Sequence, residues 1–445
     1  MKKITYLLIS FALIHSSCSK VLDVEPTDSI SSETAIKDKV GIERAIIGSY
    51  TSLQAAGLYG RNRVIIGDLA ADNLTWTGTT FEYLQIENNE ISADNGILEG
   101  VWIAAYDGLN RVNNILYKLP EIADLTAAER DRFEGEALFM RALFHFELLM
   151  FYGGVPVKVM PTLDIANVDQ ARNSAGEVFE QVIADLLSAE TRLPDVMPAG
   201  RANTYSASAM LARVYLTLFH TSGNHEYADL AIQKADRVIG EGGFSLVSSY
   251  SKLFEGSNKE IIFEIVFDAQ NKNRLAEYFF PRSLNGRYEI APSPELIQSF
   301  EPADTLRLAA TVAIDSLNKV YCNKYRELAE GSDAVIVLRL AEMYLIRAEA
   351  MAHSNGDIPS IQQNINEVRL RAGLDSTNAA TYDELKLAIE NERRHEFAFE
   401  GHRWFDLVRT RRAAGLLGIE EKYTLFPIPL SEMQTNKLMK QNNGY

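Results

Sequence analysis

The polar residues that could do chemistry are densest between Glu390 and Arg412. His395-Glu396 resembles the start of the zinc-protease motif H-E-x-x-H, but the fifth position is Phe399 instead of a second histidine. His402 lies seven residues after His395, which is about two turns of an unbroken helix. Arginines between these groups would repel a cation, and aromatic residues surround them. We therefore predict a buried ion-pair network in this segment, with a metal site as the alternative.

Aromatic side chains also gather in two segments that have no lasting helical or strand period. A sugar ring can stack its C–H face on an aromatic ring, while its hydroxyl groups need amide, hydroxyl or guanidinium partners. Both segments combine these residue types. We predict ligand contacts from seven of their residues, namely Asn73, Trp76, Phe81, Tyr83, Tyr278, Arg287 and Tyr288. The alternative is that the rings only anchor long loops onto the scaffold.

The sequence contains none of the common local motifs of catalysis or nucleotide binding. We find no G-x-S-x-G elbow, no P-loop and no dinucleotide fingerprint, and we predict neither a cofactor nor a metal. A carboxylate pair for glycoside hydrolysis is defined by distance in space, so that activity stays open as an alternative. The formal net charge of −16 argues against a nucleic-acid partner.

The first seventeen residues have the pattern of a secretory signal. Lys2 and Lys3 precede an apolar run at residues 4–14, and small polar residues lead into Cys18. A cysteine at the cleavage site is typical of bacterial lipoproteins, so we predict acylation of Cys18, with an ordinary signal peptide as the alternative. No later apolar run reaches the roughly 18 residues of a membrane helix, so the predicted attachment is by lipid alone. The other cysteine, Cys322, is predicted to be a small core residue.

Apolar residues at steps of three and four predict helices along most of the chain. These helices cover 33–54, 100–119, 132–152, 205–219, 227–239, 337–353, 358–371 and 382–400. Ser174 and Glu177 form a capping box, which predicts another helix from residue 175 to just before Pro194. Short strands are predicted at 261–267 and 320–325. The segments 57–95 and 271–294 are predicted to be loops and turns.

An internal repeat indicates how the helices are arranged. The segment 211–216 (LARVYL) matches 340–345 (LAEMYL) at four of six positions, and a second helix follows each copy. Small and large residues alternating across paired helices are typical of tetratricopeptide units. We predict a mainly α fold, a tetratricopeptide-like helical repeat scaffold with long irregular loops and a few short strands.

Motifs spread over nearly the whole chain resemble those of the SusD/RagB family of outer-membrane lipoproteins in Bacteroidetes-type bacteria. They are LDVEP at 22–26, RALFHF at 141–146, YGGVP at 152–156, the repeat segments 211–216 and 340–345, ERR at 392–394 followed by Glu396, EGHRW at 400–404, FPIP at 426–429 and the terminal QNNGY at 441–445. The resemblance implies a signal peptide at 1–17, a lipidated tether at 18–32 and a single helical domain at 33–445. Within that domain, a loop-rich part extends to about residue 300 and a helical part begins at about 301.

The resemblance also implies a function and a place in the cell. Members are generally non-catalytic, and capture glycans or in some cases peptides at the cell surface. They pass the ligand to a TonB-dependent outer-membrane barrel of the SusC type, which the lipoprotein caps like a lid. The ligand loop of the family matches Asn73 to Tyr83, with Tyr278 to Tyr288 as a second candidate. The alternatives are a peptide-binding member of the same family, a lipoprotein glycoside hydrolase and an assembly protein that binds only the barrel.

Overall fold

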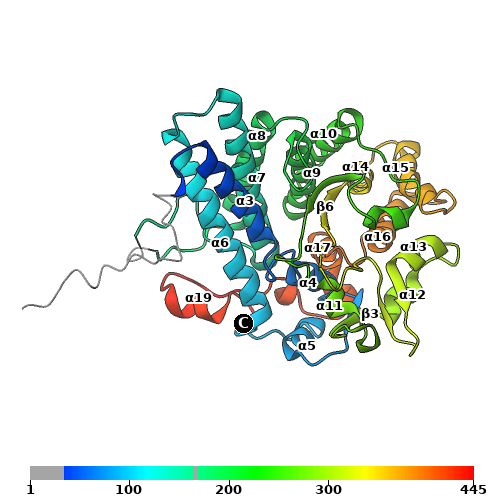
Figure 1. The fold of residues 1–445 in the computed structure, drawn as a ribbon. Coiled ribbons are helices and arrows are strands. Elements are labelled where there is room, and N and C mark those ends of the chain that lie inside the picture. Colours follow the sequence, from blue (N-terminus) through cyan, green and yellow to red (C-terminus); the bar gives the residue numbers. More distant parts are fainter. Residues whose placement is uncertain (1–34, 165–167) are drawn as a thin grey trace, which may run out of the picture.

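The computed structural model describes residues 35–164 and 168–445, so the predicted signal, Cys18 and tether lie outside the described residues. Helices form most of this part of the chain, which confirms the predicted mainly α fold (Figure 1). The α-helices are α3 (Lys39–Leu53), α4 (Asn62–Leu69), α5 (Phe81–Glu87), α6 (Gly96–Lys118), α7 (Ala127–Tyr152), α8 (Ala175–Arg192), α9 (Thr204–Ser222), α10 (His225–Glu241), α11 (Leu275–Phe279), α12 (Pro294–Ser299), α13 (Thr305–Thr311), α14 (Leu340–His353), α15 (Ile358–Arg371), α16 (Tyr382–Glu396), α17 (Arg403–Arg409), α18 (Ala413–Leu417) and α19 (Leu430–Thr435). Short 3₁₀ helices are η2 (Leu119–Glu121), η4 (Tyr250–Phe254), η5 (Arg282–Leu284) and η6 (Glu421–Thr424).

Capping residues mark where the long helices begin and end. The predicted capping box of α8 is present, because the Ser174 side chain accepts from the Glu177 N–H and the Glu177 side chain reaches back to Ser174 N–H. The same box opens α7 at Thr126. Helix α7 ends at Gly153, whose φ of 73° lies in the region that glycine adopts without steric cost.

The two copies of the internal repeat pack as neighbouring helical hairpins. Helices α9 and α10 form one hairpin, α14 and α15 form the other, and α10 packs between α9 and α14. The third position of the repeat is Arg213 in one copy and Glu342 in the other, and the two side chains form an ion pair with Nη2–Oε2 at 2.6 Å. Segments 129 residues apart in the sequence therefore meet at equivalent positions.

In the described part of the chain, six short strands pair into three antiparallel two-stranded sheets. These sheets are β1 (Leu74–Trp76) with β3 (Ile290–Pro292), β2 (Ile261–Ile265) with β6 (Val335–Arg339), and β4 (Val312–Ile314) with β5 (Val320–Cys322). In Figure 1, β3 lies beside α11 at the lower edge of the molecule, near α5.

Several local predictions are wrong. The predicted loop at 57–95 contains α4, β1 and α5, and that at 271–294 contains α11 and β3. Every residue of α4 is buried, but the helix has only eight residues, too few for a repeated apolar pattern. The predicted helix at 337–353 begins three residues later, because the apolar run before it forms β6, and such short runs fit either structure. The helix predicted to reach residue 400 ends at Glu396.

Buried side chains from Ile36 to Met439 belong to one large apolar cluster. Cys322 is among them as predicted, and burial raises the pKa of its free thiol to about 12. Across residues 35–164 and 168–445, none of the helices combines the length and the apolar character needed to cross a bilayer.

Candidate functional site

The two predicted ligand segments, 200 residues apart in the sequence, lie side by side. Strands β1 and β3 join them, with Trp76 opposite Ile290. Beyond the strands, the Thr77 N–H donates to the carbonyl oxygen of Glu289 over 2.9 Å, and the Thr77 hydroxyl donates to the Tyr288 carbonyl over 2.8 Å. The structure therefore brings the aromatic residues of both segments to one edge of the fold.

The side chain of Glu289, in the second segment, holds the first segment by hydrogen bonds. Its carboxylate accepts the backbone N–H groups of Thr79 and Thr80, at 2.9 and 3.0 Å. Burial opposes ionisation of this carboxyl, but these N–H groups outweigh burial and hold its pKa below the usual value. A Cβ at Gly78 would lie 2.1 Å from the Glu289 carboxylate, so only glycine permits this close approach. The Glu289 side chain therefore holds the residues that follow Trp76 in place.

Four of the seven predicted residues reach the surface, and we call this set the loop surface: Trp76, Phe81, Arg287 and Tyr288. Phe81 is 60% exposed, Arg287 is exposed, and Trp76 and Tyr288 are half-buried. Phe81 is the first residue of α5, which points its ring outward. Tyr288 has a φ of 55°, a conformation that is costly for a bulky residue, and its hydroxyl donates to the Val320 carbonyl over 3.1 Å. The ring of Tyr288 is thus held in a fixed position.

The other three predicted residues lie beneath the loop surface. Tyr83 and Asn73 have no exposed surface, and Tyr278 is 5% exposed. The Tyr83 hydroxyl donates to the Asn62 side chain over 3.1 Å, and its ring meets Tyr278 edge to face with centroids 6.1 Å apart. In this structure these side chains support their neighbours and offer no surface to a ligand.

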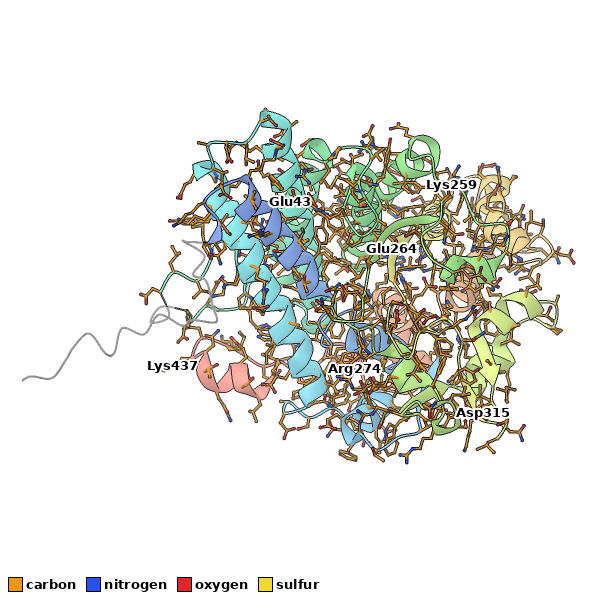
Figure 2. All side chains as sticks on the ribbon, viewed as in Figure 1. Glu43, Lys259, Glu264, Arg274, Asp315 and Lys437 are labelled. Carbon is orange, nitrogen blue, oxygen red and sulfur yellow. The ribbon has the colours of Figure 1, made fainter. Side chains whose placement is uncertain are left out.

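Arginines surround Tyr278, and the sequence did not reveal two of them. The guanidinium carbons of Arg61, Arg287 and Arg274 lie 4.4, 4.8 and 5.5 Å from the centre of the Tyr278 ring. Arg274, labelled in Figure 2, also makes two hydrogen bonds of 2.8 Å to Glu277. Arg61 was missed because it lies just before α4, far from Tyr278 in the sequence, and no local pattern marks such a contact.

The polar stretch at 390–412 is a buried ion-pair network, as predicted. We call its centre the ion-pair cluster: Arg307, Arg339, Arg371, Glu396 and Glu400. Arg339 contacts Glu396 at 2.5 Å and Glu400 at 2.8 Å, and Arg307 contacts Glu396 at 3.1 Å. Arg371 also pairs with Glu396. Burial opposes ionisation of Glu396, but the three guanidinium groups outweigh it and hold its pKa far below the usual value.

The two histidines of this stretch belong to the packing around that network. His395 Nε2 lies 2.9 Å from the Ser299 hydroxyl, and its ring stacks on Phe300 with centroids 4.5 Å apart. The ring of His402 instead lies against Phe397, at 4.9 Å. Burial and nearby arginines lower the pKa of His395 to about 3, so it is neutral at pH 7. Different aromatic neighbours thus hold the two imidazoles.

Residues of the same stretch anchor the base of the first loop segment. Arg403 Nε donates to Asp72 Oδ1 over 2.7 Å, and Arg394 Nε donates to Asn73 Oδ1 over 3.0 Å. Asn73 in turn donates to Asp68 over 2.6 Å, and burial raises the pKa of Asp68 to about 6. The charged C-terminal segment thus positions the start of β1, from which the loop surface extends.

The loop surface offers groups that are suited to non-covalent binding. Exposed aromatic faces offer apolar stacking, and the guanidinium of Arg287 offers hydrogen bonds. Two nearby carboxylates are already engaged, since Glu289 accepts backbone N–H groups and Glu277 pairs with Arg274.

Two family models match the chain. The model described as "SusD family" matches residues 313–422, and the model described as "Starch-binding associating with outer membrane" matches residues 20–216. The matched segments include the C-terminal polar stretch and the whole first loop segment.

Similar proteins include two curated relatives and one solved structure. A SusD-like protein, P2, from Formosa agariphila is 26% identical, and the alignment covers 100% of this chain and 99% of the relative. The starch-binding protein SusD of Bacteroides thetaiotaomicron is 26% identical, over 74% of this chain and 75% of that protein. The structure of a laminarin-binding SusD-like protein superposes with a TM-score of 0.82 at 25% identity, covering 92% of this chain and 100% of that chain.

Proposed function

The chain belongs to the SusD/RagB family, and from this premise we propose that it is a non-catalytic glycan-binding protein of the cell surface. The observation that carries the proposal is the loop surface, where Phe81 is 60% exposed beside Arg287 and two half-buried aromatic residues. Two relatives are named for the starch or laminarin that they bind. The ligand class proposed for this chain is therefore an oligosaccharide.

The proposed binding mode is stacking combined with hydrogen bonds. A pyranose ring presents an apolar C–H face, which fits the exposed ring of Phe81 or the outer face of Trp76. Its hydroxyl groups accept hydrogen bonds from the guanidinium of Arg287. The Glu289 contacts and the strained backbone of Tyr288 hold the site ready before the ligand arrives, which lowers the entropy cost of binding.

The acids of this region argue against hydrolysis. A glycosidase needs a carboxylic acid whose pKa is raised so that it can protonate the leaving oxygen. The Arg274 hydrogen bonds lower the pKa of Glu277, and the backbone N–H groups of Thr79 and Thr80 lower that of Glu289 against the effect of burial. Both groups are therefore ionised at neutral pH and cannot serve as that acid.

We place the protein at the outer membrane, held by acyl chains on Cys18 and exposed to the cell exterior. One matching family model is described as associating with the outer membrane, which supports this location. Delivery of the glycan to a SusC-type TonB-dependent barrel completes the proposal. Co-purification of the barrel with the acylated protein from host membranes tests this part.

Titration calorimetry with maltohexaose, laminarihexaose and a hexapeptide tests the binding function. We expect heat from at least one oligosaccharide, and at least tenfold weaker binding by Phe81→Ala, equivalent to about 1.4 kcal/mol. Leu370→Ala is the matched control, because Leu370 is 59% exposed on α15, outside the loop surface. Products after long incubation are analysed by chromatography, and we expect the oligosaccharide to remain intact.

Three outcomes would contradict the proposal. Cleavage of the oligosaccharide would make the protein a hydrolase. Heat from the peptide alone would make it a peptide-binding member of the family. Equal affinities of wild type and Phe81→Ala would remove Phe81 from the binding site.

A further inference from the structure

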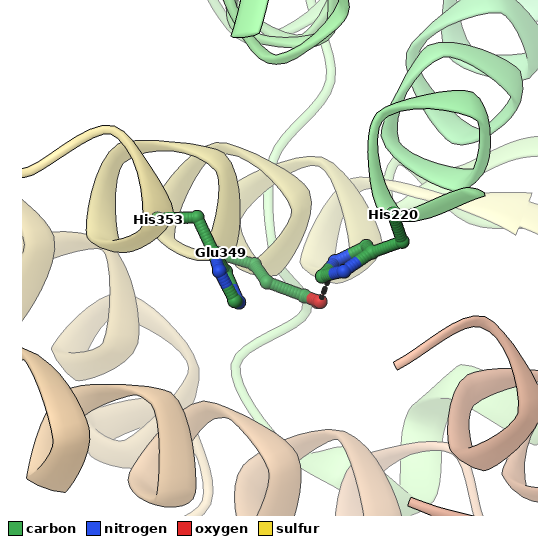
Figure 3. A group of neighbouring side chains, drawn as sticks. All are labelled: His220, Glu349 and His353. Atoms are coloured by element: carbon green, nitrogen blue, oxygen red, sulfur yellow. Dashed lines mark hydrogen bonds and ion pairs between the residues drawn. The ribbon is translucent and has the colours of Figure 1, made fainter. Parts of the chain in front are cut away.

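A second group of residues that could bind a ligand lies far from the loop surface in the sequence, between the two repeat hairpins. His220 extends from α9, and Glu349 and His353 extend from α14 toward it (Figure 3). Each residue offers one ligand atom, and these atoms lie within 4.8 Å of one another. Glu349 and His353 are four residues apart on one helix, so their side chains share a face.

The repeat explains why these side chains meet. His220 lies nine residues after Leu211, and Glu349 lies nine residues after Leu340, so both occupy the same position of the repeat. The hairpins pack with equivalent positions facing each other, and His220 Nε2 lies 2.8 Å from Glu349 Oε1. His353 adds a second imidazole one helical turn further on.

We propose that His220, Glu349 and His353 bind a zinc ion that clamps the two repeat hairpins together. Two imidazole nitrogens and one carboxylate oxygen are a common three-residue ligand set for zinc, with water in the fourth position. Magnesium and calcium prefer sites made of oxygen ligands alone, so this set favours zinc over both.

The ligand atoms must move closer together to hold the ion. A tetrahedral zinc ion with bonds of about 2.0 Å keeps its ligand atoms about 3.3 Å apart. His353 can make this movement, because within the described residues neither of its ring nitrogens forms a hydrogen bond. It lines a cavity of about 350 Å³ together with Glu349, which gives the ion a route of entry.

Arg409 is the main competitor of the ion. It contacts Glu349 Oε1 at 2.5 Å and donates to Oε2 over 2.8 Å. Zinc would replace the first contact and leave the second, so that Arg409 orients the carboxylate from behind. Arg409 and Lys386 repel the ion, while Asp406, which contacts Arg409 at 2.9 Å, offsets part of this charge. We therefore expect micromolar affinity.

Titration of the tag-free protein with zinc chloride at pH 7 tests the site. We expect one zinc ion per chain, at least tenfold weaker binding by His353→Gln and by His220→Gln, and no comparable heat from magnesium chloride. His225→Gln is the matched control, because His225 is exposed and its ring lies 5.3 Å from that of Phe219, which the ring of His353 also approaches, at 5.6 Å between centroids. Zinc should raise the melting temperature of wild type and of this control, and not that of His353→Gln.

Three results would overturn the site: no zinc binding by wild type, equal zinc affinity of His353→Gln and wild type, or equal binding of magnesium. His353→Gln removes a half-buried ring without hydrogen bonds, so we expect it to melt like wild type when no metal is present. His220→Gln serves as the second variant if His353→Gln unfolds.

Discussion

The ion-pair cluster and the loop surface are built from the same residue types, yet the first stabilises the fold and the second is proposed to bind a ligand. Both combine arginines, glutamates and aromatic rings. In the cluster every charged side chain is buried and faces an opposite charge, as with Glu396 between Arg307 and Arg339. On the loop surface Arg287 and Phe81 are exposed. Arg287 also faces opposite charges, at 3.5 Å from Glu289 and 3.8 Å from Glu277, but it does so at the surface. Exposure, more than residue type, separates a binding site from a structural one.

The two regions are also connected. Arg394 and Arg403, from the same polar stretch as Glu396, hold Asp72 and Asn73 at the base of β1. Because the loop surface extends from β1, the buried charges affect binding only by holding the loop surface in place. The comparison therefore predicts that variants of the cluster change stability, while variants of the exposed residues change affinity.

The largest expected effect comes from Glu396→Gln. The change leaves three buried guanidinium groups facing one less negative charge, and breaking such a buried pair costs about 3–5 kcal/mol. The urea dependence of unfolding, followed by circular dichroism, measures the loss. Asp107→Asn is the control, because its pair with Arg111 is about half exposed and should contribute less than about 1 kcal/mol. Similar losses in the two variants would erase the contrast between buried and exposed charges.

A pH titration probes the cluster with a smaller effect. The pKa of His395 is about 3 in the folded protein and near 6.5 in the unfolded chain, so below pH 6.5 the unfolded state binds a proton that the folded state does not. The stability present above pH 6.5 is therefore lost as the pH falls, by about 2 kcal/mol at pH 5 at about 1.4 kcal/mol per unit. His395→Gln removes this dependence, and the difference between the two unfolding curves at pH 7 and pH 5 measures it. Parallel curves would show that His395 is solvated in the fold.

The smallest expected effects come from two variants, one at an exposed residue of the loop surface and one at a buried residue beneath it. Arg287→Ala removes an exposed donor, and should weaken oligosaccharide binding several-fold without a change in melting temperature. Tyr83→Phe removes a buried hydrogen bond to Asn62, and should cost about 1 kcal/mol of stability without a change in affinity. Calorimetry and thermal melting of both variants give the four values. Loss of affinity in Tyr83→Phe alone would show that the ligand binds the buried residues beneath the loop surface instead.

The scaffold could be predicted from the sequence because its long helices repeat apolar residues at steps of three and four, and several of them begin at a capping box. Helices α7, α8 and α9 begin within five residues of their predicted starts. Helix α4 could not be predicted, because its eight residues are too few to repeat an apolar pattern that distinguishes a helix from a loop. Strand β6 is a short apolar run, which a helix would fit as well.

The residue types of the candidate site could be predicted from the sequence, but which of its side chains are buried could not. Trp76 and Tyr83 look alike in the sequence, and only packing leaves the first at the surface and buries the second. Arg61 and Glu289 act across 217 and 210 residues of chain, on Tyr278 and Thr79, and no local spacing records such contacts.

A crystal structure of the protein with a bound oligosaccharide tests the central claim most directly. We predict a sugar ring packed against Phe81 or Trp76, with a hydroxyl within hydrogen-bonding distance of Arg287 and the oligosaccharide uncleaved. A sugar bound elsewhere, with the loop surface bare, would contradict the account.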